Sequence, residues 1–198
     1  MSILALTSDT LIGTAATGNL EYNGQFFGTD SNASRAQLQR IVLSTTVAST
    51  SGTSIDFTSI PSWVKRITVM FYRVSSTGAS NYLIQIGSGS LTTSGYVSCG
   101  LAAQGGSSST AAVTSTAGLL ATADFQTGTV TNTGTLNLNL ITGSDYVSTA
   151  LSARNDGNRV STCTGSISLS GALDRLRITT VNGTDAFDAG SVNILYEG

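Results

Sequence analysis

The residues with the clearest potential for chemistry are two aspartates close together near the C-terminus. Asp185 and Asp188 lie within a glycine-flanked run, residues 183–190. Paired carboxylates serve glycosidases as acid and base, and carboxylate oxygens bind Ca²⁺. However, Ca²⁺ takes more oxygen ligands than two carboxylates supply, and aspartates in such loops usually accept hydrogen bonds from their own backbone. We therefore expect a turn here, and keep a glycan-cleaving pair as the less favoured alternative.

Two other loops have a superficial likeness to ligand-binding motifs. Asp156 lies in the run Asn155-Asp156-Gly157-Asn158, which lacks the spacing and terminal Glu of a calcium-binding EF-hand. Residues 87–90 lack the Gly-Lys-Ser/Thr of a phosphate-binding loop. The chain contains no histidine, which excludes Ser-His-Asp and Cys-His nucleophiles and a Cys/His zinc site. The sequence therefore predicts a protein that is not an enzyme and that holds no cofactor and no metal.

The charges are few and nearly balanced. Nine basic and eleven acidic residues give a net charge of −2, so no general attraction to nucleic acid or anionic lipid is expected. Four arginines could bind an anionic sugar or phosphate: Arg66, Arg73, Arg175 and Arg177. The favoured alternative is structural, in which they protect sheet edges or pair with nearby acids, namely Asp56, Asp174 and Glu197.

The strand pattern predicts an all-β protein. Residues 60–74 form the longest run rich in β-branched and aromatic residues, with Ile67, Val69 and Phe71 on one face, and we interpret them as a central strand. A similar run at 173–181 is expected in the same sheet. About ten strands at short spacing indicate an antiparallel β-sandwich, jelly-roll-like, over residues 41–198. The run 101–117 is too poor in large apolar residues to predict more than a long surface loop.

Residues 1–40 form a stem or attachment segment in this interpretation. The Asn23-Gly24 pair predicts a hairpin between aromatic arms, and Asn32 can cap a short helix over residues 33–39. A lone hairpin is marginal in water, so another copy of the chain is expected to cover it. The candidate attachment and oligomer residues are Leu4, Leu6, Leu11, Ile12, Leu20, Tyr22, Phe26 and Phe27.

The two cysteines and the N-terminus bear on where the protein resides. Residues 1–9 have no basic region and a short apolar core, and no stretch reaches a membrane-spanning length. We therefore expect synthesis in a cytoplasm without export and without membrane insertion. Cys99 and Cys163 are expected to be reduced, with a bridge between them as the alternative if their strands are neighbours.

The aromatic and polar residues suit a binding surface. Loops at 75–80, 101–117 and 153–158 are the expected display loops. Five aromatic residues could contact carbohydrate or protein, with burial in the core as the alternative for each: Tyr22, Trp63, Tyr82, Tyr96 and Tyr146.

Several runs resemble the β-rich tail-fibre and related distal structural proteins of tailed bacteriophages. They are residues 18–27, 60–69, 87–96 and 174–197. The resemblance implies a homotrimer of about 61 kDa with an N-terminal stem and a distal β-sandwich, located in the virion. It implies a non-enzymatic tail-fibre or receptor-binding protein that contacts other virion proteins through its N-terminal segment and a glycan or protein on the host surface. The alternative is a capsid decoration or head-fibre protein.

Overall fold

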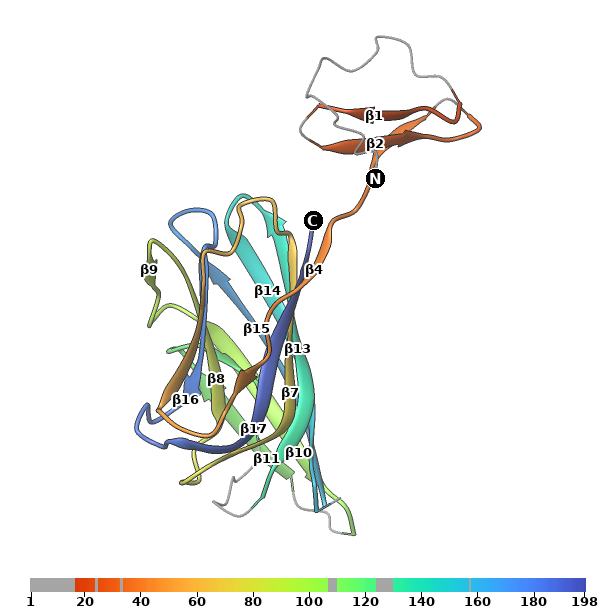
Figure 1. Cartoon of the computed structure of the whole chain (residues 1–198). Helices are drawn as coiled ribbons and strands as arrows, with labels where there is room; N and C mark the ends of the chain where they lie inside the picture. Colours follow the sequence, from red (N-terminus) through yellow and green to blue (C-terminus); the bar gives the residue numbers. More distant parts are fainter. Residues whose placement is uncertain (1–16, 24, 33, 107–109, 124–129, 157) are drawn as a thin grey trace. The chain divides into compact units, whose positions relative to one another are not determined.

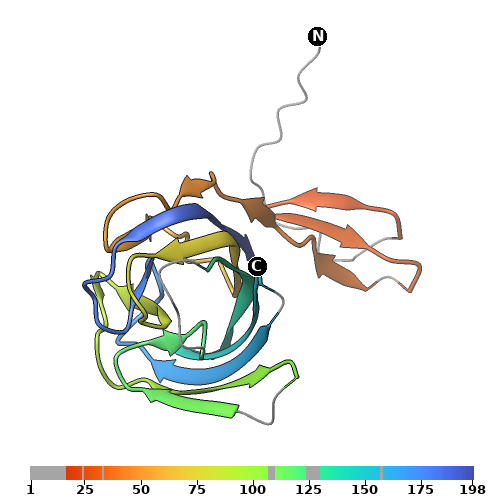
Figure 2. The ribbon, with the colours of Figure 1, turned by 90° about the horizontal axis from the view of Figure 1, so that it is seen from below.

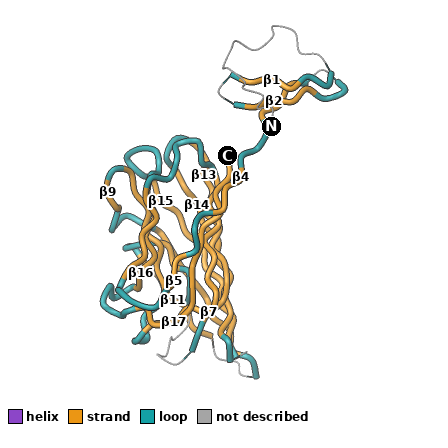
Figure 3. The backbone as a smooth tube through the Cα atoms, in the orientation of Figure 1, coloured by secondary structure: helices purple, strands orange, loops and turns teal. Residues whose placement is uncertain are grey.

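The computed structural model describes residues 17–23, 25–32, 34–106, 110–123, 130–156 and 158–198. The chain divides into two compact units, Met1–Arg40 and Ile41–Gly198. All regular elements of the described residues are β-strands, and Figure 3 shows them joined by loops and turns with no helix among them. The all-β fold class is therefore confirmed.

The N-terminal unit contains a three-stranded antiparallel sheet in the order β1-β2-β3. Its strands are β1 (Leu20–Tyr22), β2 (Phe26–Thr29) and β3 (Arg35–Gln37). Tyr22 pairs with Phe26, so the predicted hairpin is confirmed, while its Gly24 lies outside the described residues. The predicted helix over 33–39 is wrong. Asp30 Oδ1 accepts the backbone N–H groups of Asn32 and Ser34, each at 2.9 Å, and this turn leads directly into β3.

The C-terminal unit is built from two antiparallel sheets. The larger has nine strands in the order β11-β10-β15-β14-β13-β7-β17-β4, with β5 also paired to β17. The bounds of its strands are β4 (Ile41–Leu43), β5 (Val47–Ala48), β7 (Arg66–Ser76), β10 (Val97–Gln104), β11 (Thr110–Ser115), β13 (Asn132–Thr142), β14 (Asp145–Arg154), β15 (Arg159–Ser168) and β17 (Phe187–Glu197). The predicted strand at residues 60–74 is β7, between β13 and β17 and therefore central.

The second sheet has five strands in the order β12-β8-β16-β6, with β9 paired to β8. Its strands are β6 (Ser54–Thr58), β8 (Tyr82–Ser88), β9 (Ser90–Leu91), β12 (Leu119–Leu120) and β16 (Arg175–Thr180). Because β16 lies here and β7 lies in the larger sheet, the expectation that these two strands share a sheet is wrong.

The core lies between the two sheets, as in a β-sandwich, and Figure 2 shows the sheets curving around it. Inward-facing side chains alternate with outward-facing ones along each long strand, as the pleat requires. Val69 of β7, Leu136 of β13, Ile84 of β8 and Leu176 of β16 have no exposed surface. Tyr82 lies among aromatic rings, with its ring centroid 6.3 Å from that of Phe71.

The region 101–117 is a hairpin, so the expectation of a long surface loop is wrong. β10 continues to Gln104 and pairs with β11 from Ser98↔Ser115 to Ala103↔Thr110. Inward-facing residues here are small because the interior has no room for more. A Cβ on Gly100 would lie 2.6 Å from Cys163 Sγ.

Candidate functional site

Loops gather at one end of the sandwich, and we call this end the loop end. The pairs Gln104↔Arg159 and Thr180↔Tyr82 place the β10–β11, β14–β15, β7–β8 and β16–β17 connections there. The chain enters the sandwich at Ile41, which pairs with Glu197 at the opposite end of the larger sheet. Figure 1 shows the two ends of this unit, with the loop end at the bottom. The chain therefore enters the sandwich at the end opposite to these loops.

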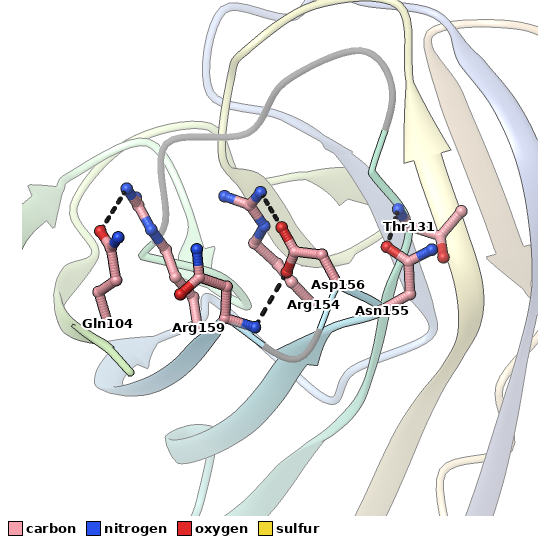
Figure 4. A network of polar contacts seen from close by, with 7 residues as sticks. Gln104, Thr131, Arg154, Asn155, Asp156 and Arg159 are labelled. Atoms are coloured by element: carbon pink, nitrogen blue, oxygen red, sulfur yellow. Dashed lines mark hydrogen bonds and ion pairs between the residues drawn. The ribbon is translucent and has the colours of Figure 1, made fainter. Parts of the chain in front are cut away.

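A polar network orders the β14–β15 connection at the loop end (Figure 4). Arg154 Nη2 forms an ion pair with Asp156, whose Oδ1 also accepts the Asn158 N–H at 3.1 Å. The Asn158 N–H and the Arg154 guanidinium hold the pKa of the Asp156 carboxyl below its ordinary value. Arg159 Nη2 donates to Gln104 Oε1 at 3.0 Å and thus links this connection to β10. The structure confirms the turn interpretation of Asp156.

The residue that precedes β13 joins the same network. Asn155 donates its backbone N–H to Thr131 O at 2.9 Å, and its Oδ1 accepts the Thr131 N–H at 3.1 Å. The side chain of Asn155 thereby replaces a strand partner where β13 begins. These hydrogen bonds connect the start of β13, the β14–β15 connection and the end of β10.

The two C-terminal aspartates connect residues 185–188 to residues 75–80 through hydrogen bonds. Asp185 Oδ2 accepts the Ser80 N–H at 3.0 Å, and its Oδ1 accepts the side-chain amide of Asn182 at 2.7 Å. Asp188 Oδ1 accepts the hydroxyl of Ser75. A Cβ on Gly78 would lie 2.2 Å from the Asp185 carboxylate, so a larger residue there would displace this carboxylate. The turn interpretation expected both carboxylates to accept hydrogen bonds from their own backbone; the partners are instead the Ser80 N–H and the side chains of Asn182 and Ser75. Within the described residues no group of three His, Cys, Asp or Glu side chains could hold a metal ion.

Three of the four candidate arginines form ion pairs with the acids named for them from the sequence. Arg66 pairs with Glu197, Arg175 Nε lies 2.7 Å from Asp174, and Arg177 holds Asp56 through two bonds of 2.7 Å. The structural interpretation of these three is confirmed.

Arg175 and Arg177 also form the floor of a groove of about 260 Å³ on the smaller sheet. One wall is Gly89, Ser90 and Leu91, which include β9, and the other wall is part of β6. The hydrogen bond and charge of Asp56 raise the pKa of Arg177. The charges of the groove are thus compensated within the chain, which disfavours it as a site for an anionic ligand.

The candidate attachment residues fall into two groups. Leu4, Leu6, Leu11 and Ile12 lie outside the described residues. In the hairpin, Leu20 is 64% exposed, Phe26 is 44% exposed, and Tyr22 and Phe27 are partly buried.

The buried side chains of the described part of this unit are polar, Glu21 and Thr29, with Glu21 in an ion pair with Arg35 at 2.6 Å. Within the described residues of its unit, the hairpin therefore has no buried apolar side chain.

The surface aromatics differ from the expected set. Tyr82, Tyr96 and Tyr146 are buried in the sandwich, so the core alternative holds for them. Trp63 is partly buried with its ring centroid 5.8 Å from that of Tyr196. Tyr72 is 63% exposed on β7 and had no distinguishing signal in the sequence beyond its outward position.

Both cysteines are free in this fold. Cys99 is exposed and Cys163 is buried, and they lie on neighbouring strands in which Cys99 pairs with Thr164 and Gly100 with Cys163. The register places the two thiols on opposite faces of the sheet. Burial raises the pKa of the Cys163 thiol to about 12.

Comparisons with family models, with curated proteins and with solved structures found no match. No helix in the described part of the chain is long and apolar enough to cross a membrane.

Proposed function

We propose that this protein is a non-enzymatic structural component of a tailed-bacteriophage virion, a tail fibre or receptor-binding protein that assembles as a homotrimer of about 61 kDa. Residues 1–40 attach it to other virion proteins, and residues 41–198 present the loop end to a glycan or protein of the host surface. The observation that carries this proposal is the division of the chain into two units: an N-terminal unit whose described part exposes Leu20 and Phe26, and a sandwich whose loops lie opposite its point of entry.

The chemistry of the described residues supports contact over catalysis. The carboxylates with a possible acid–base role, Asp185 and Asp188, hold neighbouring loops in place. The arginines of the groove have carboxylate partners. The described part of the loop end offers shape and hydrogen-bonding groups to a partner.

Imaging of intact particles carrying a labelled copy of the chain tests this proposal. We expect label at the tail; label on the head would replace the tail-fibre role by the capsid decoration or head-fibre alternative, and absence of label from particles would refute a virion role altogether. A chain lacking residues 1–40 should remain folded, since the sandwich has its own core, but should no longer enter particles.

The enzymatic alternative has its own test. The double substitution Asp185→Asn and Asp188→Asn should leave any glycan-depolymerising activity of the preparation unchanged. Loss of such an activity, with the fold retained by circular dichroism, would make the protein an enzyme and overturn the proposal.

A further inference from the structure

The outer face of five adjacent strands of the larger sheet, up to the edge where Arg66 of β7 lies opposite Asn139, carries almost no charge. We define this outer face as the side chains of five adjacent strands that point away from the smaller sheet. They are Thr110, Ala112 and Thr114 of β11; Val97, Cys99, Leu101 and Ala103 of β10; Val160, Thr162, Thr164, Ser166 and Ser168 of β15; Asp145, Val147, Thr149, Leu151 and Ala153 of β14; and Thr133, Thr135, Asn137, Asn139 and Ile141 of β13. Asp145 alone among them is charged, and it lies at the rim, where it accepts the hydroxyl of Ser168.

Such a face is unusual for a surface in water. The surface of a small soluble domain commonly has about a quarter to a third charged residues, and interface centres are depleted in charge. Large aliphatic side chains stand on this face instead: Val97 is 72% exposed, Leu151 59%, Val160 50% and Leu101 44%. Their side chains would lose unfavourable contact with water if another surface covered them.

The face is also hollowed towards its β11 edge. An open depression of about 370 Å³ lies among β10, β11 and β15, lined by Cys99, Leu101, Ala112 and Thr162 among others. Because the lining is mostly aliphatic and hydroxyl-bearing, it fits aliphatic side chains such as those on the same face. It offers no charged group to a polar ligand.

The size of the face matches a stable contact between proteins. Its strands have 6 to 11 residues. Five strands spaced about 4.8 Å apart and rising about 3.3 Å per residue cover roughly 700 Å² as a plane. A standard protein interface buries about 800 Å² on each partner.

We propose that other copies of this chain cover the outer face, so that the sandwich itself, and not only residues 1–40, holds the assembly together. Around the threefold axis of a homotrimer, the neutral faces of neighbouring copies can meet without like-charge repulsion, whereas a charged partner would have its charges desolvated without counter-ions. The inference rests on the proposed function in taking the partner to be another copy of this chain.

The reactivity of the Cys99 thiol can measure whether this interface forms. It stands on the outer face and is exposed in the single chain, whereas Cys163 is buried and its raised pKa keeps it as an unreactive thiol. We expect the native protein to have a mass of about 61 kDa by light scattering at micromolar concentration, three times the chain mass. We also expect Cys99 to react slowly with a thiol reagent such as DTNB until denaturant is added.

The variant Leu101→Asp with Leu151→Asp should expose Cys99 to rapid reaction and lower the mass towards that of one chain, 20.2 kDa. Both leucines are exposed in the single chain, so the fold should be retained. The control is Val181→Asp, which changes an aliphatic residue of similar exposure, 46%, at the loop end. It should alter neither the mass nor the reaction rate.

Three outcomes would overturn the inference: a native protein of one chain mass, a freely reactive Cys99 in the native oligomer, or an aspartate variant that keeps both the mass and the protected thiol. These results are distinct from failure of the virion role, because a protein found on particles with a freely reactive Cys99 refutes only the interface. A self-associated protein with a protected Cys99 that is absent from particles refutes only the virion role.

Discussion

Removing the hydroxyl of Tyr96 should destabilise the sandwich far more than the loss of one oxygen atom suggests. Tyr96 is 1% exposed, and its hydroxyl accepts the Ile86 N–H at 2.9 Å. The single hydrogen of this hydroxyl is shared between two acceptors, Thr92 O at 2.9 Å and Ile86 O at 3.1 Å. Ile86 needs this partner because β12 pairs only as far as Ile84 and β9 begins its pairing at Gly87. The tyrosine therefore fills a gap in the ladder along β8.

The expected cost of Tyr96→Phe follows from the group left behind. The substitution leaves the buried Ile86 N–H without its acceptor, and an unsatisfied buried donor costs about 1–3 kcal/mol. At about 2 kcal/mol, the midpoint of thermal unfolding should fall by about 4–8 °C for a unit of this size. Tyr72→Phe is the matched control, because Tyr72 is 63% exposed and the same atom is removed. It should change the stability by less than about 0.5 kcal/mol.

Urea unfolding followed by the fluorescence of the single tryptophan measures both variants. Trp63 packs against the core beside Tyr196, so its emission reports loss of the sandwich. Equal free energies of unfolding for the two variants would show that the hydroxyl of Tyr96 is not part of the ladder and would refute the reasoning. A larger loss for Tyr72→Phe would do the same.

Three further predictions concern backbone strain, pH and surface charge. Gly190→Ala should destabilise the protein by at least about 2 kcal/mol in thermal unfolding, because Gly190 has a φ of +90° and a Cβ there would lie 2.3 Å from Arg73 O. Burial raises the pKa of both Tyr82 and Tyr96 to about 12, above the ordinary 10.0, so these protons bind the folded state more tightly. The free energy of unfolding should consequently be constant with respect to these groups below pH 10 and fall as the pH rises from about 10 to 12, as measured by urea unfolding across that range. Arg177→Gln should cost less than about 1 kcal/mol in urea unfolding, because its ion pair with the carboxylate on β6 is solvent-accessible.

The strands that the sequence predicted well are those in which large apolar residues alternate with polar ones. The run expected at 173–181 contains β16, and the alternation of Ile67, Val69 and Phe71 matches the buried face of β7. The alternation itself predicts which side chains are buried, because the apolar face of a strand must be shielded from water in any arrangement of the sheet. The element type follows from that requirement, without knowledge of the neighbours.

The wrong predictions concern segments whose structure depends on neighbouring strands. The helix expected over 33–39 is replaced by β3 because β2 offers pairing partners to Ala36 and Gln37, which local propensity does not encode. The strands within 101–117 have small residues because Gly100 meets Cys163 at close range, and small residues carry no hydrophobic alternation. Likewise, two similar basic-Ile-Thr runs do not reveal that they belong to opposite sheets.

The candidate site follows the same division. The sequence predicted that arginines pair with Asp56, Asp174 and Glu197, because oppositely charged side chains on neighbouring strands tend to form ion pairs. The loop-end network and the uncharged outer face were not predicted, since both depend on which strands lie side by side. Only the register shows that Leu101 and Leu151 face the same way across β15, each opposite Thr162.

The placement of charge links the fold to the proposed role. Among the described residues, five arginines form the ion pairs given above: Arg35, Arg66, Arg154, Arg175 and Arg177. None of them belongs to the outer face, although Arg66 of β7 lies beside it, opposite Asn139. The five-stranded outer face is left nearly uncharged, and an exposed face with little charge and several large aliphatic side chains is typical of an interaction surface. A chain that places its charges at loops and strand ends and keeps a broad face uncharged is suited to assembly and contact.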